Sequence, residues 1–310
     1  MSSDRSPNPS PVEAWSVDPN LRFDRVHVIE SLNTGFAGRN GRRLAEELES
    51  LAVGGPVKVT YHPVDGRDLF RAIMLAIVAE AQAGHYPLIH IEAHGKPRNP
   101  GPSGTSRGLE LASGETILWS EVEPFLTEIN RVTRLRLLVY VATCFGADIA
   151  TLLRPTERAV ARMLIGPKDS ISMGVLETGT NTFYRSLFKK SDGGQALRDM
   201  NEATNYAFFP FSAEWMFLQI LKGYFNEYTT PQQIAIRAER IVAHMVLNGA
   251  TREQAERARR EMHAFLENRQ LVFDTHYRRF FFVDEHPEIA ERFKMTFEGC
   301  FQEAEPAPAP

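Results

Sequence analysis

His94 and Cys144 are the side chains of this sequence whose types and positions best suit covalent chemistry. His94 follows the apolar run "PLIHIEA", and Cys144 follows "LLVYVAT" 50 residues later. A glycine comes soon after each of them, Gly95 after the histidine and Gly146 after the cysteine. A thiol beside an imidazole forms a nucleophile–base pair, and a glycine lets the backbone turn and direct an N–H group into a cleft. We therefore expect a Cys–His hydrolytic site in which the amides of Gly95 and Cys144 bind an oxyanion.

The elements that must position these residues alternate between strand and helix from Arg25 to about Ala207. Such alternation predicts an α/β fold with a mostly parallel sheet and helices on both faces, and the continuous apolar runs indicate strands buried on both sides. The histidine and cysteine strands are consecutive major strands, so we expect them to be neighbours, with the site at their carboxyl ends. The predicted strands are 25–31, 57–64, 86–95, 134–144 and 162–167, and the predicted helices are 40–52, 68–84, 145–154, 181–190 and 194–203.

Other parts of the chain depart from this alternation. Two short alternating runs around Ser113-Gly114 predict a hairpin, and Ser120 with Glu123 predicts a capping box at the start of the next helix. Beyond about Phe211 the pattern is helical, although the aromatic stretch 270–288 could also add a strand. The predicted organisation is a disordered arm at 1–20, the α/β domain at 21–210, a mainly helical region at 211–304 and a flexible tail at 305–310.

Composition excludes several classes of function. A formal net charge of -4 provides no basic field for nucleic acid, and no apolar run is long enough for a membrane span. The N-terminus lacks the pattern of a secretory signal, and two cysteines in a chain of 310 residues fit a reducing compartment. These features lead us to expect a cytoplasmic protein without direct contact with nucleic acid or membrane.

The segments "PLIHIEAHG", "GLELASGETILWSEV" and "RLRLLVYVATCFG" together resemble the caspase-like cysteine peptidases, and most closely their bacterial CHAT branch. The resemblance covers about Arg25 to Ala207. It implies a caspase-like α/β/α sandwich with a helical C-terminal appendage, and a cysteine endopeptidase with His94 and Cys144 as its dyad. It also implies that no metal or organic cofactor is needed, that the substrate is a protein, and that activity is regulated, in a stress pathway or in antiviral defence. A regulatory protein could then dock on the C-terminal helices.

The residues that would select the substrate are less well defined by the sequence. In caspases and metacaspases, the residue two positions before the cysteine lines the first pocket, and here it is the uncharged Ala142. Any preference for charge must therefore come from surrounding residues. Arg39 is the candidate for a positive wall, and Asp148 and Glu177 are the candidates for a negative one.

Two other functions remain open. Gly35, Gly38 and Gly41 lie between a strand and a helix and could cradle a phosphate, which would indicate a nucleotide-binding doubly wound domain. The second alternative is a non-catalytic interaction module that has the same fold. A metal site is disfavoured, because the histidines and the glutamate at positions 90, 92 and 94 lie along one extended strand, where three ligands cannot converge.

Overall fold

A computed structural model describes residues 22–32, 40–96, 108–152, 154 and 157–301. The chain divides into two compact units. The first runs to Leu153 and resumes over Ala159–Trp215, and the second contains Arg154–Arg158 and Met216–Pro310. Within the described ranges, no helix combines the length and the apolar character that crossing a membrane requires.

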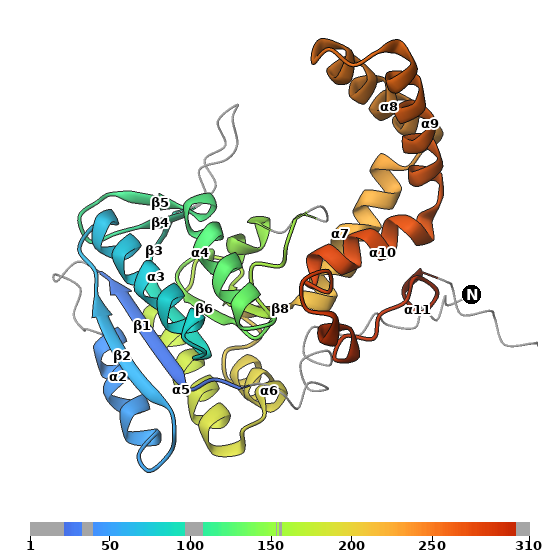
Figure 1. Cartoon of the computed structure of the whole chain (residues 1–310). Helices are drawn as coiled ribbons and strands as arrows, with labels where there is room; N and C mark the ends of the chain where they lie inside the picture. Colours follow the sequence, from blue (N-terminus) through green and yellow to red (C-terminus); the bar gives the residue numbers. More distant parts are fainter. Residues whose placement is uncertain (1–21, 33–39, 97–107, 153, 155–156, 302–310) are drawn as a thin grey trace, which may run out of the picture. The chain divides into compact units, whose positions relative to one another are not determined.

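The first unit is built on a sheet whose main path has the strand order β2-β1-β3-β6-β7-β8 (Figure 1). All neighbouring strands along this path are parallel except β7 and β8, which are antiparallel. The α/β class and the mostly parallel sheet predicted from the sequence are thus confirmed. The strands are β1 (Arg25–Ser31), β2 (Lys58–Pro63), β3 (Pro87–Lys96), β6 (Leu138–Ala142), β7 (Met163–Pro167) and β8 (Phe208–Ser212).

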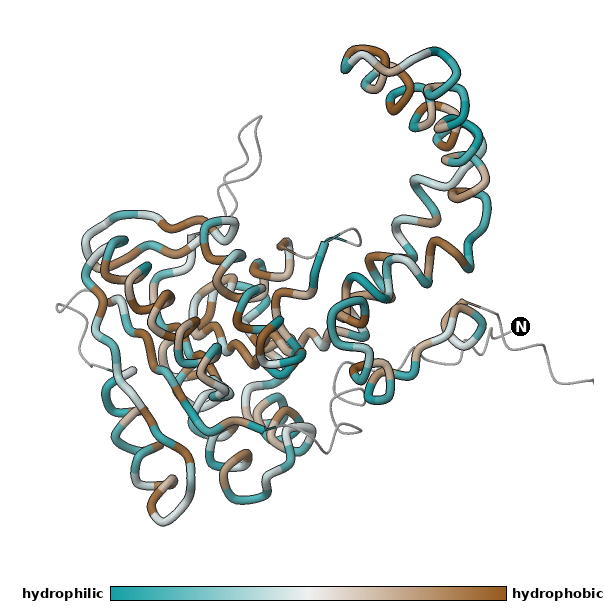
Figure 2. Tube along the Cα trace, in the orientation of Figure 1, coloured by the Kyte–Doolittle hydropathy of each residue, from teal (hydrophilic) through white to brown (hydrophobic). Residues whose placement is uncertain are grey.

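Helices cover both faces of this sheet, as the alternating pattern predicts. On one face, side chains of α2, α5 and α6 join those of the strands in a single apolar cluster around Tyr140 and Phe183. On the opposite face lie α3 and α4, and Figure 2 shows hydrophobic residues recurring along the strands between the two layers. The helices are α2 (Asn40–Leu51), α3 (Arg67–Gln82), α4 (Trp119–Val132), α5 (Met173–Lys190) and α6 (Gly193–Ala203).

The predicted hairpin forms at the tip of β3. Its strands are β4 (Gly108–Glu110) and β5 (Thr116–Leu118), and β4 pairs with the last three residues of β3. The helix after the hairpin begins earlier than predicted. The backbone N–H of Leu118 donates to the carboxylate of Glu121 at 3.0 Å, so that Leu118 is the N-cap and Ser120 lies inside the helix.

The structure corrects two other predictions and decides a third that was left open. The segment after Cys144 forms a 3-10 helix, η1 (Gly146–Leu152), instead of an α-helix. β8 begins three residues before the region expected to be helical and pairs with β7, although Pro210 interrupts its sequence. The aromatic stretch that could have added a strand forms α10 (Arg269–Phe280).

The second unit is helical, as predicted. Thr230 caps α8, and Thr251 with Gln254 forms the predicted capping box at the start of α9. The aromatic residues at positions 280–282 are buried, and the ring of Phe217 lies 5.3 Å from those of Phe280 and Phe281. The helices are α7 (Ala213–Tyr228), which begins in the first unit, α8 (Pro231–Leu247), α9 (Arg252–Glu267), α10, η2 (Pro287–Glu291) and α11 (Phe297–Phe301).

Candidate active site

The register of β3 and β6 aligns the two reactive residues. These strands are parallel, and their Cα partners run from Leu88↔Leu138 to Glu92↔Ala142 with a constant offset of 50 residues. The same offset relates His94 to Cys144, two residues beyond the last pair. Because side chains alternate between the faces of a strand, His94 falls on the same side of the sheet as Glu92.

The backbones of Gly95 and Cys144 are in direct contact. A Cβ atom on residue 95 would lie 1.6 Å from the carbonyl oxygen of Cys144 and 2.7 Å from its carbonyl carbon. Only glycine can occupy this position without moving the neighbouring chain. The antiparallel pairing of Gly95 with Leu109 holds the other edge of the β3 tip, so the hairpin fixes the tip in place.

A tight turn presents Cys144 at the end of β6. Phe145 adopts a left-handed conformation with φ of 57°, and the N–H of Gly146 donates to the carbonyl of Thr143 at 3.1 Å. The N–H of Phe145 donates to the carbonyl of Asp169 at 3.1 Å, which ties the turn to the segment after β7. The turn therefore holds the backbone on both sides of Cys144.

The thiol of Cys144 faces the segment that precedes α5. Its Sγ lies 3.7 Å from the hydroxyl oxygen of Ser170 and 3.8 Å from the carbonyl oxygen of Ile171. Cys144 and His94 are both half-buried, and neither Cys144 nor Cys300 forms a disulfide. The thiol is therefore reduced, partly accessible and held by two strands and a loop.

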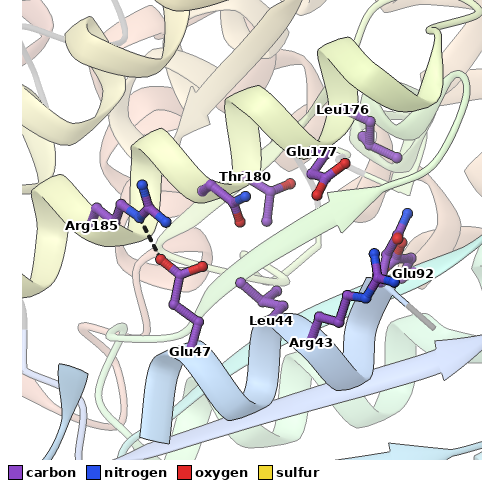
Figure 3. A pocket seen from close by; sticks show the side chains of 10 residues that line it. Arg43, Leu44, Glu47, Glu92, Leu176, Glu177, Thr180 and Arg185 are labelled. Carbon is purple, nitrogen blue, oxygen red and sulfur yellow. Dashed lines mark hydrogen bonds and ion pairs between the residues drawn. The ribbon is translucent and has the colours of Figure 1, made fainter. Parts of the chain in front are cut away.

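A cavity of about 280 Å³ lies between α2 and α5 on the same side of the sheet (Figure 3). Glu92 of β3 contributes to its lining and is only 5% exposed. One end is closed by an ion pair between Glu47 of α2 and Arg185 of α5. The remaining lining residues are Asn40, Arg43, Leu44, Leu176, Glu177, Thr180 and Asn181.

A second buried carboxylate, Glu30, lies beside Glu92 in register on β1. It accepts a hydrogen bond from the N–H of Gly41 at 2.9 Å and another from the hydroxyl of Tyr61. Glu30 therefore anchors the first turn of α2. The sequence analysis did not identify this residue, although an acidic side chain near the end of an otherwise apolar strand was a visible signal.

His90, two residues before Glu92 on β3, packs against the apolar cluster. Nδ1 of His90 lies 3.2 Å from the hydroxyl of Tyr184, and its ring stacks on Tyr140. Burial raises the pKa of both tyrosines well above the usual range, so both remain neutral phenols. Within the described ranges, no group of three His, Cys, Asp or Glu side chains has a geometry that could hold a metal ion.

Arg39, Asp148 and Glu177, which the sequence suggested for the substrate pocket, lie in different parts of the chain. Glu177 is exposed on α5 and contributes to the lining of the cavity, whereas Asp148 is half-buried on η1. Arg39 lies outside the described residues, as do Gly35 and Gly38 of the glycine-rich segment. Of the three candidates, Glu177 is therefore the one that the structure brings to the cavity.

Comparisons with known proteins found little similarity. No protein-family model matches the chain, and no curated protein matches its sequence. Among solved structures, the Drosophila initiator caspase Dronc is similar with a TM-score of 0.45 and 9% sequence identity, over 61% of this chain and 76% of that one. The roles of individual residues must therefore be argued from the geometry of this chain alone.

Proposed function

We propose that this protein is a caspase-like cysteine endopeptidase with Cys144 as its nucleophile and His94 as its general acid and base. The observation that carries the proposal is the contact between Gly95 and the backbone of Cys144, in segments that follow the paired residues Glu92 and Ala142. His94 and Cys144 both lie at the carboxyl ends of neighbouring parallel strands, which supports their pairing. Nucleophile–base pairs in cysteine hydrolases need this proximity.

The proposed reaction proceeds through an acyl-enzyme. The Cys144 thiolate attacks the scissile carbonyl carbon, and the amides of Gly95 and Cys144 stabilise the resulting oxyanion. His94, in its imidazolium form, protonates the leaving amine as the C–N bond breaks. Neutral His94 then removes a proton from water, which attacks the thioester, and the thiolate leaves as the carboxylate product forms. This sequence balances without a metal or an organic cofactor.

The local structure around the thiol supports this assignment. The left-handed turn at Phe145 directs the chain away immediately after Cys144, and Gly146 packs closely against the carbonyl of Val141. The loop at Ser170 and Ile171 provides polar atoms near the sulfur without covering it completely.

The proposal includes a regulated role for the helical region. In α8 and α9 only Ile234, Ala238, Ala255 and Leu266 are buried, so most of this helix pair is available to other molecules. We assign the protein to the bacterial CHAT-type branch, acting in the cytoplasm on a protein partner in a stress or defence pathway. Docking of a regulatory or substrate protein on these helices belongs to the same proposal.

The test uses a thiol-directed peptide electrophile together with a peptide-library cleavage assay. Cys144→Ala should abolish both labelling and hydrolysis, and His94→Ala should abolish hydrolysis. Each variant should change the free energy of unfolding by no more than about 1–2 kcal/mol, because little buried volume is lost. Cys300→Ser is the matched control and should retain full activity. Hydrolysis that survives in Cys144→Ala would refute the proposal and favour a non-catalytic module.

A further inference from the structure

A second cavity, of about 750 Å³, lies at the amino ends of the first three strands. Its lining includes Asp24, Val57 and Tyr86, the residues directly before β1, β2 and β3. These strands are parallel, so this end of the sheet is opposite the end that carries His94 and Cys144. The cavity is therefore separate from the candidate active site.

The apolar core of the first unit is incompletely covered at this cavity. Five of the lining residues pack against the core and are only partly buried, namely Phe23, Leu51, Ala52, Val57 and Phe188. The rings of Phe23 and Phe188 lie 5.7 Å apart in an edge-to-face contact. Val53, which also lines the cavity, is 82% exposed. An apolar group that enters here would remove its own surface and that of these side chains from water, so its binding is favourable.

The polar groups of the lining limit what kind of group can enter. The carboxylate of Asp24 is already engaged within the fold, because Oδ1 accepts from the N–H of Tyr86 at 2.7 Å and Oδ2 lies 2.8 Å from Nδ1 of His85. Ser191, at the end of α5, is exposed and lines the cavity. Its hydroxyl can accept a hydrogen bond. A mainly apolar ring with one N–H or O–H donor therefore suits this cavity best.

The chain that leads into the cavity carries one such ring. Arg22 lines the cavity, and residues 1–21, here called the N-terminal segment, lie outside the described ranges. The sequence of this segment is rich in Ser, Pro and Asn, and Trp15 is its only aromatic residue. Trp15 precedes Arg22 by seven residues, which reach at most about 25 Å when extended. That length is ample for the chain to turn back into a cavity that Arg22 itself lines.

We propose that the N-terminal segment binds back on this end of the sheet and that the indole ring of Trp15 occupies the cavity. The ring packs against Phe23 and Phe188, and its N–H group donates to the hydroxyl of Ser191. The tether at Arg22 makes this binding intramolecular, which raises the effective concentration of the ring, and four prolines in the segment restrict its free conformations. This interaction goes beyond the proposed peptidase function and does not depend on it.

The test replaces Trp15 of the full chain with the photoreactive residue benzoylphenylalanine and maps its cross-links by mass spectrometry. We expect cross-links to residues 51–57 and 187–191, which line the cavity. A mixture of isotopically labelled and unlabelled protein shows whether they form within one chain, as we expect. Cross-links between chains would assign the cavity to the N-terminal segment of a second copy and overturn the intramolecular proposal. Cross-links only to other parts of the chain, or none, would overturn the site itself.

Val53→Glu provides the matching change in the cavity. It introduces a charge at an exposed position, so the fold should be kept, and it should lower the yield of these cross-links about fivefold or more. The control is Leu75→Glu, because Leu75 of α3 is 58% exposed and does not line the cavity. That variant should give the parental yield. Equal yields from Val53→Glu and Leu75→Glu would overturn the assignment of this cavity.

Thermal unfolding of full-length variants gives a second measure. Trp15→Ser should lower the melting temperature by about 2–4 °C, because the ring no longer covers the half-buried apolar side chains. In the Val53→Glu background, the same substitution should cause little further change, since the two residues act through one contact. Additive shifts in the double variant would contradict the proposed contact.

Discussion

Replacing Gly95 with alanine tests whether the two strand tips must touch. The added Cβ would lie 1.6 Å from the carbonyl oxygen of Cys144, whereas real Cβ contacts essentially never fall below 3.0 Å, so the tips must separate by at least 1.4 Å (3.0 − 1.6). Gly95 does not have a positive φ, and the effect is therefore steric instead of conformational. The backbone of a paired strand cannot rotate away as a flexible side chain could.

A separation of this size should reduce the activity strongly while it lowers the stability of the fold only moderately. Misplacement of reacting groups by about 1 Å can cost about 100-fold in rate, so we expect Gly95→Ala to lower kcat/KM by about 100-fold or more. Overpacking of a well-ordered region costs about 1–3 kcal/mol, so the protein should remain folded with a lower melting temperature. The assay is peptide cleavage together with thermal unfolding, and the alkylation rate of Cys144 in a Cys300→Ser background provides a second measure of its position.

The matched control is Gly174→Ala. Gly174 lies in the first turn of α5, and a Cβ there would have no neighbour within 4 Å. The same substitution should leave activity within about twofold and stabilise the helix by up to about 1 kcal/mol. A Gly95→Ala protein with parental kcat/KM and parental melting temperature would show that the contact has been misinterpreted.

Two further predictions concern the stability of the first unit. Glu214→Ala should lower the free energy of unfolding by about 3 kcal/mol in urea titrations, because Glu214 pairs with the guanidinium of Arg162, which is 2% exposed, and its loss removes a carboxylate from that buried charge. A loss below about 1 kcal/mol would contradict this reasoning. Burial, together with the charges of His62 and Arg25, lowers the pKa of His27 from 6.5 to about 3, so the folded state binds this proton less readily than the unfolded chain. The resulting stability is complete above about pH 6.5 and is lost as the pH falls towards 3, which predicts a loss of about 2 kcal/mol between pH 7 and pH 5 in parallel urea titrations. His27→Gln should flatten this slope, and an unchanged slope would exclude His27 as its source.

The sequence predicts a strand correctly where the pattern of the segment itself agrees with its pairing in the sheet. The first three strands, at 25–31, 57–64 and 86–95, form within one residue of the predicted ends, because clear helical segments separate them. β8 was missed because Pro210 and a short run of aromatics resemble a connection, and an edge strand tolerates a proline that an interior strand would not. Tertiary pairing with β7 decides its conformation, and no local pattern reports that pairing.

The region after Phe211 shows how an aromatic run can mislead. Val272, Phe273, His276, Tyr277 and Phe280 are the buried residues of α10. Their spacing follows the period of a helix, but the aromatic residues of this run suggested a possible strand. The helical period was therefore present in the sequence, and the spacing of the apolar residues favours a helix where the composition suggested a strand.

At the site, the sequence identified the residue types but not their environment. The 50-residue spacing between His94 and Cys144 was visible, and its meaning as a strand register required the pairing of β3 with β6. No pattern in the sequence indicates the left-handed backbone conformation of Phe145, because glycine or asparagine is the usual residue in that conformation. The cavity depends on how α2 and α5 approach each other, which residues 130 positions apart in the chain cannot reveal.

Gly95 and Ala142 are small residues at the two strand tips, and they act differently in this arrangement. The absence of a side chain at Gly95 lets its backbone touch that of Cys144, whereas Ala142 is buried as the register partner of Glu92. Because the contact at Gly95 joins two backbones, it does not depend on which peptide is bound. Substitutions at position 95 should therefore lower the rate for every peptide alike, and a variant that lost the cleavage of only some peptides would contradict this reasoning.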